Sequence, residues 1–165
     1  MGIATGGTKG AHLIVESLPI TRAWALHRDM TDAYRWHRQF LQHLQAKYRG
    51  EHWVLKTPSH LAYLRYLLAQ YPDANIVWTH RQPLDAIASF SSLATKLHRG
   101  FSDSVNSKAL AEHEMQHFAK QLTMGMQQRT QLDRGQFLDV SFTSICEDPV
   151  DSVRGIYRYF DITLT

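Results

Sequence analysis

The sequence predicts an α/β fold in which helices flank a parallel sheet. Short β-rich segments alternate with amphipathic helical patterns along most of the chain. Strands that are separated by helices imply βαβ units, and the strands of such units lie parallel. Cationic residues follow directly after two of the β-rich segments. Because ligands of open α/β sheets bind outside the carboxyl ends of the strands, we expect a ligand site there.

The N-terminal half is expected to contain a leader, two helices and one strand. Residues 1–12 are glycine-rich and predict a flexible leader. Apolar residues at helical spacing predict a helix over residues 21–48. The apolar segment 53–55 predicts a short strand. A second helix is expected over residues 59–70, where Ser59 can serve as the N-cap.

The C-terminal half repeats the alternation of strand and helix. Residues 75–79 are apolar and β-rich, which predicts a buried parallel strand. A helix over residues 84–98 follows it, and a long helical pattern covers residues 108–133. Residues 136–142 predict a third strand. An Asp-Pro pair then begins the last predicted helix, over residues 148–160.

Length and composition favour one domain, over residues 13–165, that binds an anion. The 165 residues are enough for one substantial core. The net charge is +3, and the basic residues are dispersed, so we expect no nucleic-acid partner. Cys146 is the single cysteine, which excludes an internal disulfide and indicates a passive thiol. No apolar run reaches the roughly 20 residues of a membrane span, and no signal peptide is evident, so a cytoplasmic location is expected.

The segment 79–90, THRQPLDAIASF, has the features of a phosphate site. Arg81 follows a strand, and Pro83 suits the first turn of a helix. Arginine can bind a phosphate through two parallel hydrogen bonds, and free helix N–H groups and the hydroxyl of Ser89 add donors. The alternative is that Arg81 pairs with Asp85 and that Ser89 is an ordinary helix residue. The spacing alone leaves both interpretations open.

A second polar turn follows the first predicted strand, in the segment LKTPSHL. Lys56 can reach a phosphate or sulfate oxygen, and Thr57 offers a hydroxyl. His60 is a titratable group in the same turn. The alternatives are that Lys56 is a solvated loop residue and that His60 caps a helix or is half-buried.

Residues 53–93 and 137–165 together resemble PAPS-dependent sulfotransferases, PAPS being 3′-phosphoadenosine 5′-phosphosulfate. The likeness is strongest to the bacterial sulfotransferase-like proteins and more distant to tyrosylprotein sulfotransferases. It rests on WVLKTPSHLAYLRYLLAQYPDANIVWTHRQPLDAIASFSSL and on FLDVSFTSICEDPVDSVRGIYRYFDITLT, in that order. It covers residues 14–165 and implies a three-layer, P-loop-like parallel sheet between helices.

The resemblance implies a role for each matching residue. Arg81 and Ser89 match the pair that holds the 3′-phosphate of PAPS. Lys56, with Thr57 beside it, matches the basic turn that contacts the phosphosulfate. His60 lies near the family's catalytic base, although Pro58 and Ser59 intervene here. Phe142 stands where the family often has tyrosine, which removes a hydroxyl from the nucleotide site.

The loop that binds the 5′-phosphosulfate in this family is not evident in the sequence. The segment Gly6–Gly10 is the nearest match, but it lacks the Walker A pattern and has no strand before it. The chain is therefore expected to be a partial domain that lacks the first strand of the sheet. Such a loss leaves a strand edge unpaired. A second copy of the chain or the long N-terminal helix could cover that edge.

The function that the resemblance implies is transfer of a sulfuryl group from PAPS to a hydroxyl or amine acceptor, without a metal. The acceptor, a small molecule or a peptide, is not indicated. His60 or Glu16 would be the base. A nucleotide-binding paralogue or fragment that acts as a scaffold is the alternative, and the absence of GxxxxGK[ST] argues against a kinase. Aromatic residues at helical spacing could line an acceptor pocket or belong to the core: Trp24, Tyr34, Trp36 and Tyr63.

Overall fold

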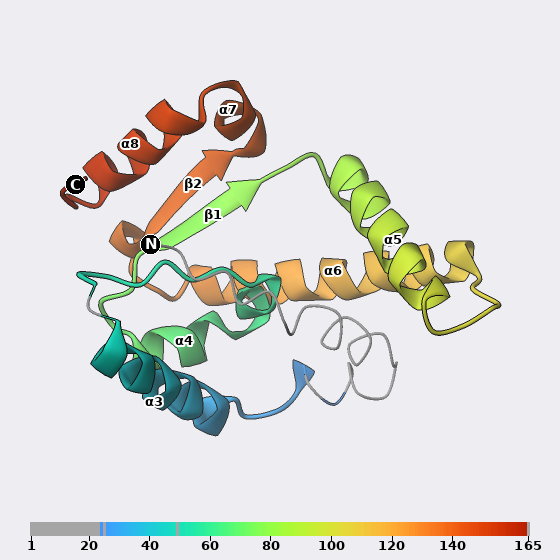
Figure 1. The fold of residues 1–165 in the computed structure, drawn as a ribbon, viewed down its shortest axis with the longest axis horizontal. Coiled ribbons are helices and arrows are strands. Elements are labelled where there is room, and N and C mark those ends of the chain that lie inside the picture. Colours follow the sequence, from blue (N-terminus) through green and yellow to red (C-terminus); the bar gives the residue numbers. More distant parts are fainter. Residues whose placement is uncertain (1–23, 25, 49, 165) are drawn as a thin grey trace.

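The computed structural model describes residues 24, 26–48 and 50–164, and Figure 1 shows their arrangement. The predicted leader, Gly6–Gly10 and Glu16 lie outside the described residues. The elements along the chain are α3 (Thr31–Lys47), η1 (Pro58–Tyr63), α4 (Leu64–Gln70), β1 (Ile76–His80), α5 (Pro83–Arg99), α6 (Ser107–Arg129), η2 (Arg134–Gln136), β2 (Phe137–Ser141), α7 (Phe142–Glu147) and α8 (Pro149–Tyr159).

The sheet of the described residues consists of two parallel strands, β1 and β2. Their register pairs Ile76 with Phe137 at one end and His80 with Ser141 at the other. The helices α5 and α6 form the crossover between them. In Figure 1 the sheet lies between α7 and α8 on one side and α6, α4 and α3 on the other. The predicted α/β fold with layers of helices around a parallel sheet is confirmed, and both strands end at the same edge.

Local signals in the sequence explain where most helices begin. Pro83 occupies the first turn of α5, where its missing N–H removes no helical hydrogen bond. Asn106 caps α6, because its side chain accepts from the backbone N–H of Ala109 at 3.0 Å. Asp148 caps α8 by accepting from the N–H of Asp151 at 2.9 Å. These helices therefore begin within one residue of their predicted starts.

Three helical predictions need correction. The helix predicted over residues 21–48 is interrupted: Trp24 and Leu26 are helical, a turn and bend follow at His27 and Arg28, and α3 begins at Thr31 after an uncapped Met30. The helix predicted from Ser59 begins as the 3₁₀ helix η1, and its N-cap is Thr57, whose hydroxyl accepts from the N–H of Ser59 at 3.4 Å. The short helix α7 was not predicted; it forms where Ser141 caps the chain as it leaves β2.

The strand predicted over residues 53–55 is wrong for the described structure. This segment has no strand partner, since the described sheet contains β1 and β2 alone. A strand needs a neighbour to satisfy its N–H and C=O groups, and apolar residues without one remain exposed. Val54 is 69% exposed and Leu55 42%. β1 is also less buried than predicted, since each of its five residues is either half-buried or exposed.

The core lies where α3, η1, α4 and β2 meet. Its buried members are Tyr34, Ala62, Tyr63, Leu64, Leu67, Leu68 and Phe137. Helix α6 packs against η1 through Gly125 and Gln128. The Gln128 side chain donates to the carbonyl of Ala62 at 2.7 Å and accepts from the N–H of Arg65 at 3.0 Å. Between residues 24 and 164, no described helix is both long and apolar enough to cross a bilayer.

Candidate anion site at the carboxyl edge of the sheet

An open hollow of about 540 Å³ lies at the edge where β1 and β2 end. Its walls come from the end of each strand, from the first turn of α5 and from α7. The lining residues are His80, Arg81, Gln82, Asp85, Ser141, Phe142, Thr143 and Cys146. This is the edge at which the order of strands and helices predicted a ligand site.

Arg81 supplies the positive charge of the hollow. It is exposed, and its guanidinium carbon lies 4.7 Å above the centre of the Phe142 ring. Arg81 and Asp85 form no ion pair in the described structure, so the alternative that Asp85 neutralises Arg81 is not realised there. The face of the Phe142 ring attracts the Arg81 guanidinium electrostatically. The N–H donors of Arg81 remain available to a ligand.

The N-terminus of α5 faces the same hollow. No side chain caps this helix at Gln82, and Pro83 carries no N–H, so the N–H groups of Leu84 and Asp85 are left without a capping partner. The helix dipole adds partial positive charge at this end. The carboxylate of Asp85 lies in the first turn and opposes that charge. Arg81 and the helix end together can hold one anionic group.

Ser89 lies one turn further along α5. It stands four residues after Asp85, so the two side chains project from the same face of the helix. Ser89 is exposed, but it is not among the residues that line the hollow. The structure therefore places Arg81 in the hollow and Ser89 beyond it on the adjoining helix face.

Beside Arg81, three side chains form a hydrogen-bonded network that the sequence did not predict. Asp139 of β2 accepts two hydrogen bonds from Arg129, at 2.7 and 2.6 Å, and a third from His80 Nε2 at 2.6 Å. The hydrogen bond from Arg129, the largest cause, and then that from His80 hold the pKa of the Asp139 carboxyl well below its usual range. The only sequence signal is a carboxylate in the middle of the apolar segment FLDVS.

Lys56 and Thr57 lie in the exposed segment that leads into η1. Both side chains are exposed, and neither lines the hollow beside Arg81. The hydroxyl of Thr57 is occupied as the N-cap of η1. Lys56 and Thr57 are thus neighbours in this segment, and neither lines the hollow in which Arg81 lies.

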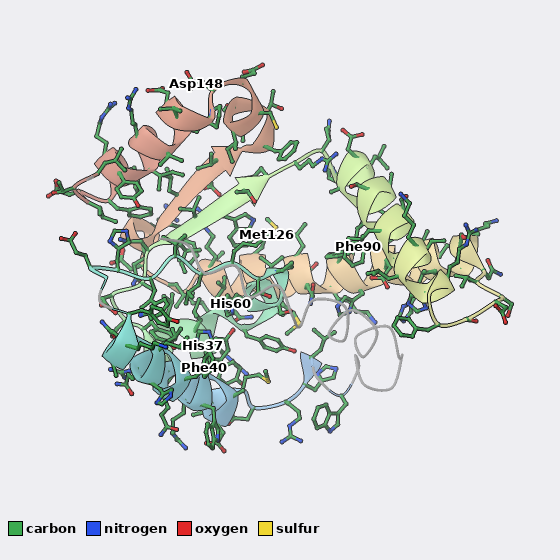
Figure 2. All side chains as sticks on the ribbon, in the orientation of Figure 1. His37, Phe40, His60, Phe90, Met126 and Asp148 are labelled. Carbon is green, nitrogen blue, oxygen red and sulfur yellow. The ribbon has the colours of Figure 1, made fainter. Side chains whose placement is uncertain are left out.

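His60 lies in a cluster with Tyr34, His37 and Tyr71, and Figure 2 shows the labelled side chains of His37 and His60 near each other. His60 Nδ1 and the Tyr34 hydroxyl are hydrogen-bonded at 2.7 Å, as are His37 Nδ1 and the Tyr71 hydroxyl. Burial, and then the neighbouring His37, lower the pKa of His60 to about 4. His60 is therefore neutral near pH 7, and Nε2 can accept a proton only in the tautomer in which Nδ1 donates to Tyr34.

The aromatic residues considered for an acceptor pocket divide into two groups. Tyr34 and Tyr63 are buried in the core, whereas Trp24 and Trp36 are 59% and 72% exposed. The two exposed rings are therefore the members of this set that a bound molecule could reach. The described residues contain no group of three His, Cys, Asp or Glu side chains placed to hold a metal ion.

Comparison with known proteins gives consistent results. Residues 9–165 match the profile described as the Sulfotransferase family. The structure is similar to that of sulfotransferase STF1 from Mycobacterium tuberculosis, with 35% identity and a TM-score of 0.79, over 91% of this chain and 42% of that one. It is also similar to sulfotransferase STF9 from Mycobacterium avium, with 28% identity and a TM-score of 0.73, over 88% and 38%. The search of curated proteins gave no significant match. The chain thus spans about two fifths of the length of these solved structures.

Proposed function

The chain belongs to the sulfotransferase family, and from this premise we propose that it binds PAPS for sulfuryl transfer to a hydroxyl or amine acceptor. One observation carries the proposal: Arg81 lies in an open hollow at the carboxyl edge of a parallel sheet, beside an uncapped helix N-terminus. This combination favours a phosphate group. The acceptor stays open here.

We assign the 3′-phosphate of PAPS to Arg81 and Ser89. The guanidinium would bind two phosphate oxygens through charge-assisted hydrogen bonds, and the free N–H groups of α5 would add donors. The Ser89 hydroxyl, exposed on the adjoining helix face, would bind a third oxygen or the ribose. A 5′-nucleotide without this phosphate leaves Arg81 without its anionic partner. The site therefore predicts a strong preference for adenosine 3′,5′-bisphosphate over 5′-AMP.

The transfer itself would require positioning and neutralisation of charge. The acceptor oxygen or nitrogen bonds to sulfur as the bond from sulfur to the bridging phosphate oxygen breaks, which leaves adenosine 3′,5′-bisphosphate. Lys56 would neutralise the charge that develops on the bridging oxygen, with Thr57 fixing the turn. The acceptor's proton would pass to His60 Nε2, in the tautomer in which Nδ1 donates to Tyr34.

The single cysteine provides a direct test of the binding site. Cys146 is exposed and lines the hollow, so its alkylation by iodoacetamide reports whether the hollow is filled. Adenosine 3′,5′-bisphosphate should slow alkylation, and 5′-AMP at the same concentration should not. Arg81→Ala should lose this protection, whereas Arg99→Ala, at the other end of α5, should keep it. Equal protection by both nucleotides would refute the assignment of the 3′-phosphate.

A scaffold role is the second candidate, because the chain spans only 42% and 38% of the solved sulfotransferases. Incubation with radiolabelled PAPS and a panel of phenols, sugars and peptides separates the two. Transfer that is lost in Arg81→Ala supports the enzyme. Protection of Cys146 without transfer to any acceptor supports a nucleotide-binding scaffold. Magnesium-dependent ATP hydrolysis would contradict both.

We also propose that a second copy of the chain covers an outer edge of the two-stranded sheet. In the described structure each strand has one neighbour only, so each has one unpaired edge. Sedimentation velocity over a range of protein concentrations would detect such a dimer. A monomer at every concentration would refute it.

A further inference from the structure

His80 directly precedes Arg81 in the chain. Its imidazole is the second group in the hollow that can carry a positive charge. It is the last residue of β1 and lines the hollow. Its Nε2–H donates to Asp139 at 2.6 Å. The second ring nitrogen, Nδ1, forms no hydrogen bond with any protein group in the described part of the chain. This nitrogen can therefore serve a ligand.

The charge on Asp139 does not depend on His80. Arg129 already binds both carboxylate oxygens of Asp139, at 2.7 and 2.6 Å. The charges of Arg129 and Asp139 therefore cancel. The network of Arg129, Asp139 and His80 carries no net charge with a neutral His80 and one positive charge with a protonated His80. The other charged or titratable groups of the hollow are Arg81, Asp85 and Cys146.

The ring of His80 is held in one orientation from two sides. Asp139 fixes Nε2, and the indole of Trp78 stacks on the imidazole with an interplanar angle of 6° and centroids 6.2 Å apart. The guanidinium carbon of Arg129 lies 5.2 Å from the centre of the Trp78 ring and so helps to hold the indole in place. An imidazole fixed in this way presents Nδ1 without first losing rotational freedom, which favours binding.

We propose that His80 is a phosphate-binding residue of this hollow, which takes up a proton when a phosphate monoester binds beside Arg81 and donates a hydrogen bond to it from Nδ1. The inference rests on the proposed function, because it concerns the same phosphate. The bound dianion favours the imidazolium, and Asp139 accepts from Nε2–H in both protonation states. The phosphate would thus be held by two cations, the guanidinium of Arg81 and the imidazolium of His80.

Isothermal titration calorimetry with adenosine 3′,5′-bisphosphate tests the proposed proton uptake. Repeating the titration in buffers of different ionisation enthalpy gives the number of protons taken up per ligand bound. The matched variant is His80→Gln, whose amide nitrogen can replace Nε2 as donor to Asp139 but cannot take up a proton. At pH 7 the wild type should take up more protons per ligand than His80→Gln. Its affinity at pH 6 should be about tenfold higher than that of the variant, as expected for one charge-assisted hydrogen bond.

The outcomes separate the inference from the proposed function. Equal proton counts and equal affinities of wild type and His80→Gln, with binding still lost in Arg81→Ala, refute the role of His80 and leave the nucleotide site intact. No binding to the wild type refutes both. A purely structural role would lower the melting temperature of His80→Gln while leaving the proton count unchanged, and this outcome also overturns the inference.

Discussion

The backbones of α6 and η1 approach each other closely at Gly125 and Leu61. A β-carbon on Gly125 would lie 2.6 Å from the backbone oxygen of Leu61 and 2.7 Å from its Cδ1. Backbone atoms cannot move aside as a flexible side chain can. Gly125→Ala should therefore destabilise the protein by about 1–3 kcal/mol, the usual cost of overpacking. Urea unfolding followed by circular dichroism gives this value.

Gly155 of α8 is the control for this substitution. A β-carbon there would meet no atom within 4 Å. Gly155→Ala should stabilise the helix by about 0.5–1 kcal/mol, because alanine loses less backbone entropy than glycine. Effects of the same sign in the two variants would contradict the close approach at Gly125.

The side chain of Gln128 should contribute measurably to the free energy of unfolding. Its amide bonds the carbonyl of Ala62 and the N–H of Arg65, where η1 continues into α4. Gln128→Ala leaves both backbone groups without this partner, which should cost about 1–3 kcal/mol. The neighbouring Gln127→Ala, at an exposed position, should change the unfolding free energy by less than about 0.5 kcal/mol. Equal losses in the two variants would show that the bridge contributes nothing.

The ring of Phe142 should support ligand binding through Arg81. Phe142→Leu removes the ring below the guanidinium, and an exposed cation–π contact contributes about 0.5–1 kcal/mol. The affinity for adenosine 3′,5′-bisphosphate should fall about two- to fivefold. Phe142→Tyr keeps the ring and restores a hydroxyl, so it should bind at least as tightly as the wild type. Titration calorimetry on both variants measures the difference, and unchanged affinity in Phe142→Leu would refute this role.

The cluster of His37 and His60 should make the fold sensitive to acid. Burial lowers the pKa of both histidines, that of His60 to about 4. From about pH 6.5 down to about pH 4, the unfolded chain binds protons that the folded chain does not. Stability should therefore fall as the pH falls through this window, by up to about 3 kcal/mol for His60. Urea unfolding at pH 7, 6, 5 and 4.5 measures the slope.

His60→Asn provides the comparison for this pH dependence. The amide nitrogen of asparagine can replace Nδ1 in the bond to Tyr34 but does not titrate. The variant should lose less stability than the wild type between pH 6.5 and pH 4.5. Parallel pH profiles would show that the buried imidazole is not responsible.

Much of the C-terminal half of the fold could be predicted because its signals are local. Pro83 and Asp148 mark helix starts that the structure reproduces, and the β-rich segments of β1 and β2 lie within one residue of their predicted starts. These residues act on their own backbone neighbours, so the sequence alone contains the information. Arg81 accordingly lies at the predicted sheet edge, while its ligand stays a prediction.

The features that could not be predicted depend on distant partners. Residues 53–55 have the composition of a strand, but pairing requires a neighbour that the described residues do not supply. His80 and Asp139 are 59 positions apart, and only the register of β1 and β2 brings them together. His60 appeared to be a residue of a polar turn, yet its bond to Tyr34, 26 positions away, places it in a half-buried cluster. Sequence spacing contains no measure of such contacts.

The junction of α7, which lines the hollow, and α8 is held by several hydrogen bonds. Asp148 alone separates the two helices: its N–H donates to the carbonyl of Ser144, and its carboxylate caps α8. The Ser152 hydroxyl also donates to the Ser144 carbonyl, at 3.1 Å. Figure 2 labels Asp148 at this bend. These bonds fix the start of α8 to α7, so we expect a shift of Phe142 and Thr143 on ligand binding to move α8 as well. A fluorophore near Arg158 should therefore register ligand binding in the hollow.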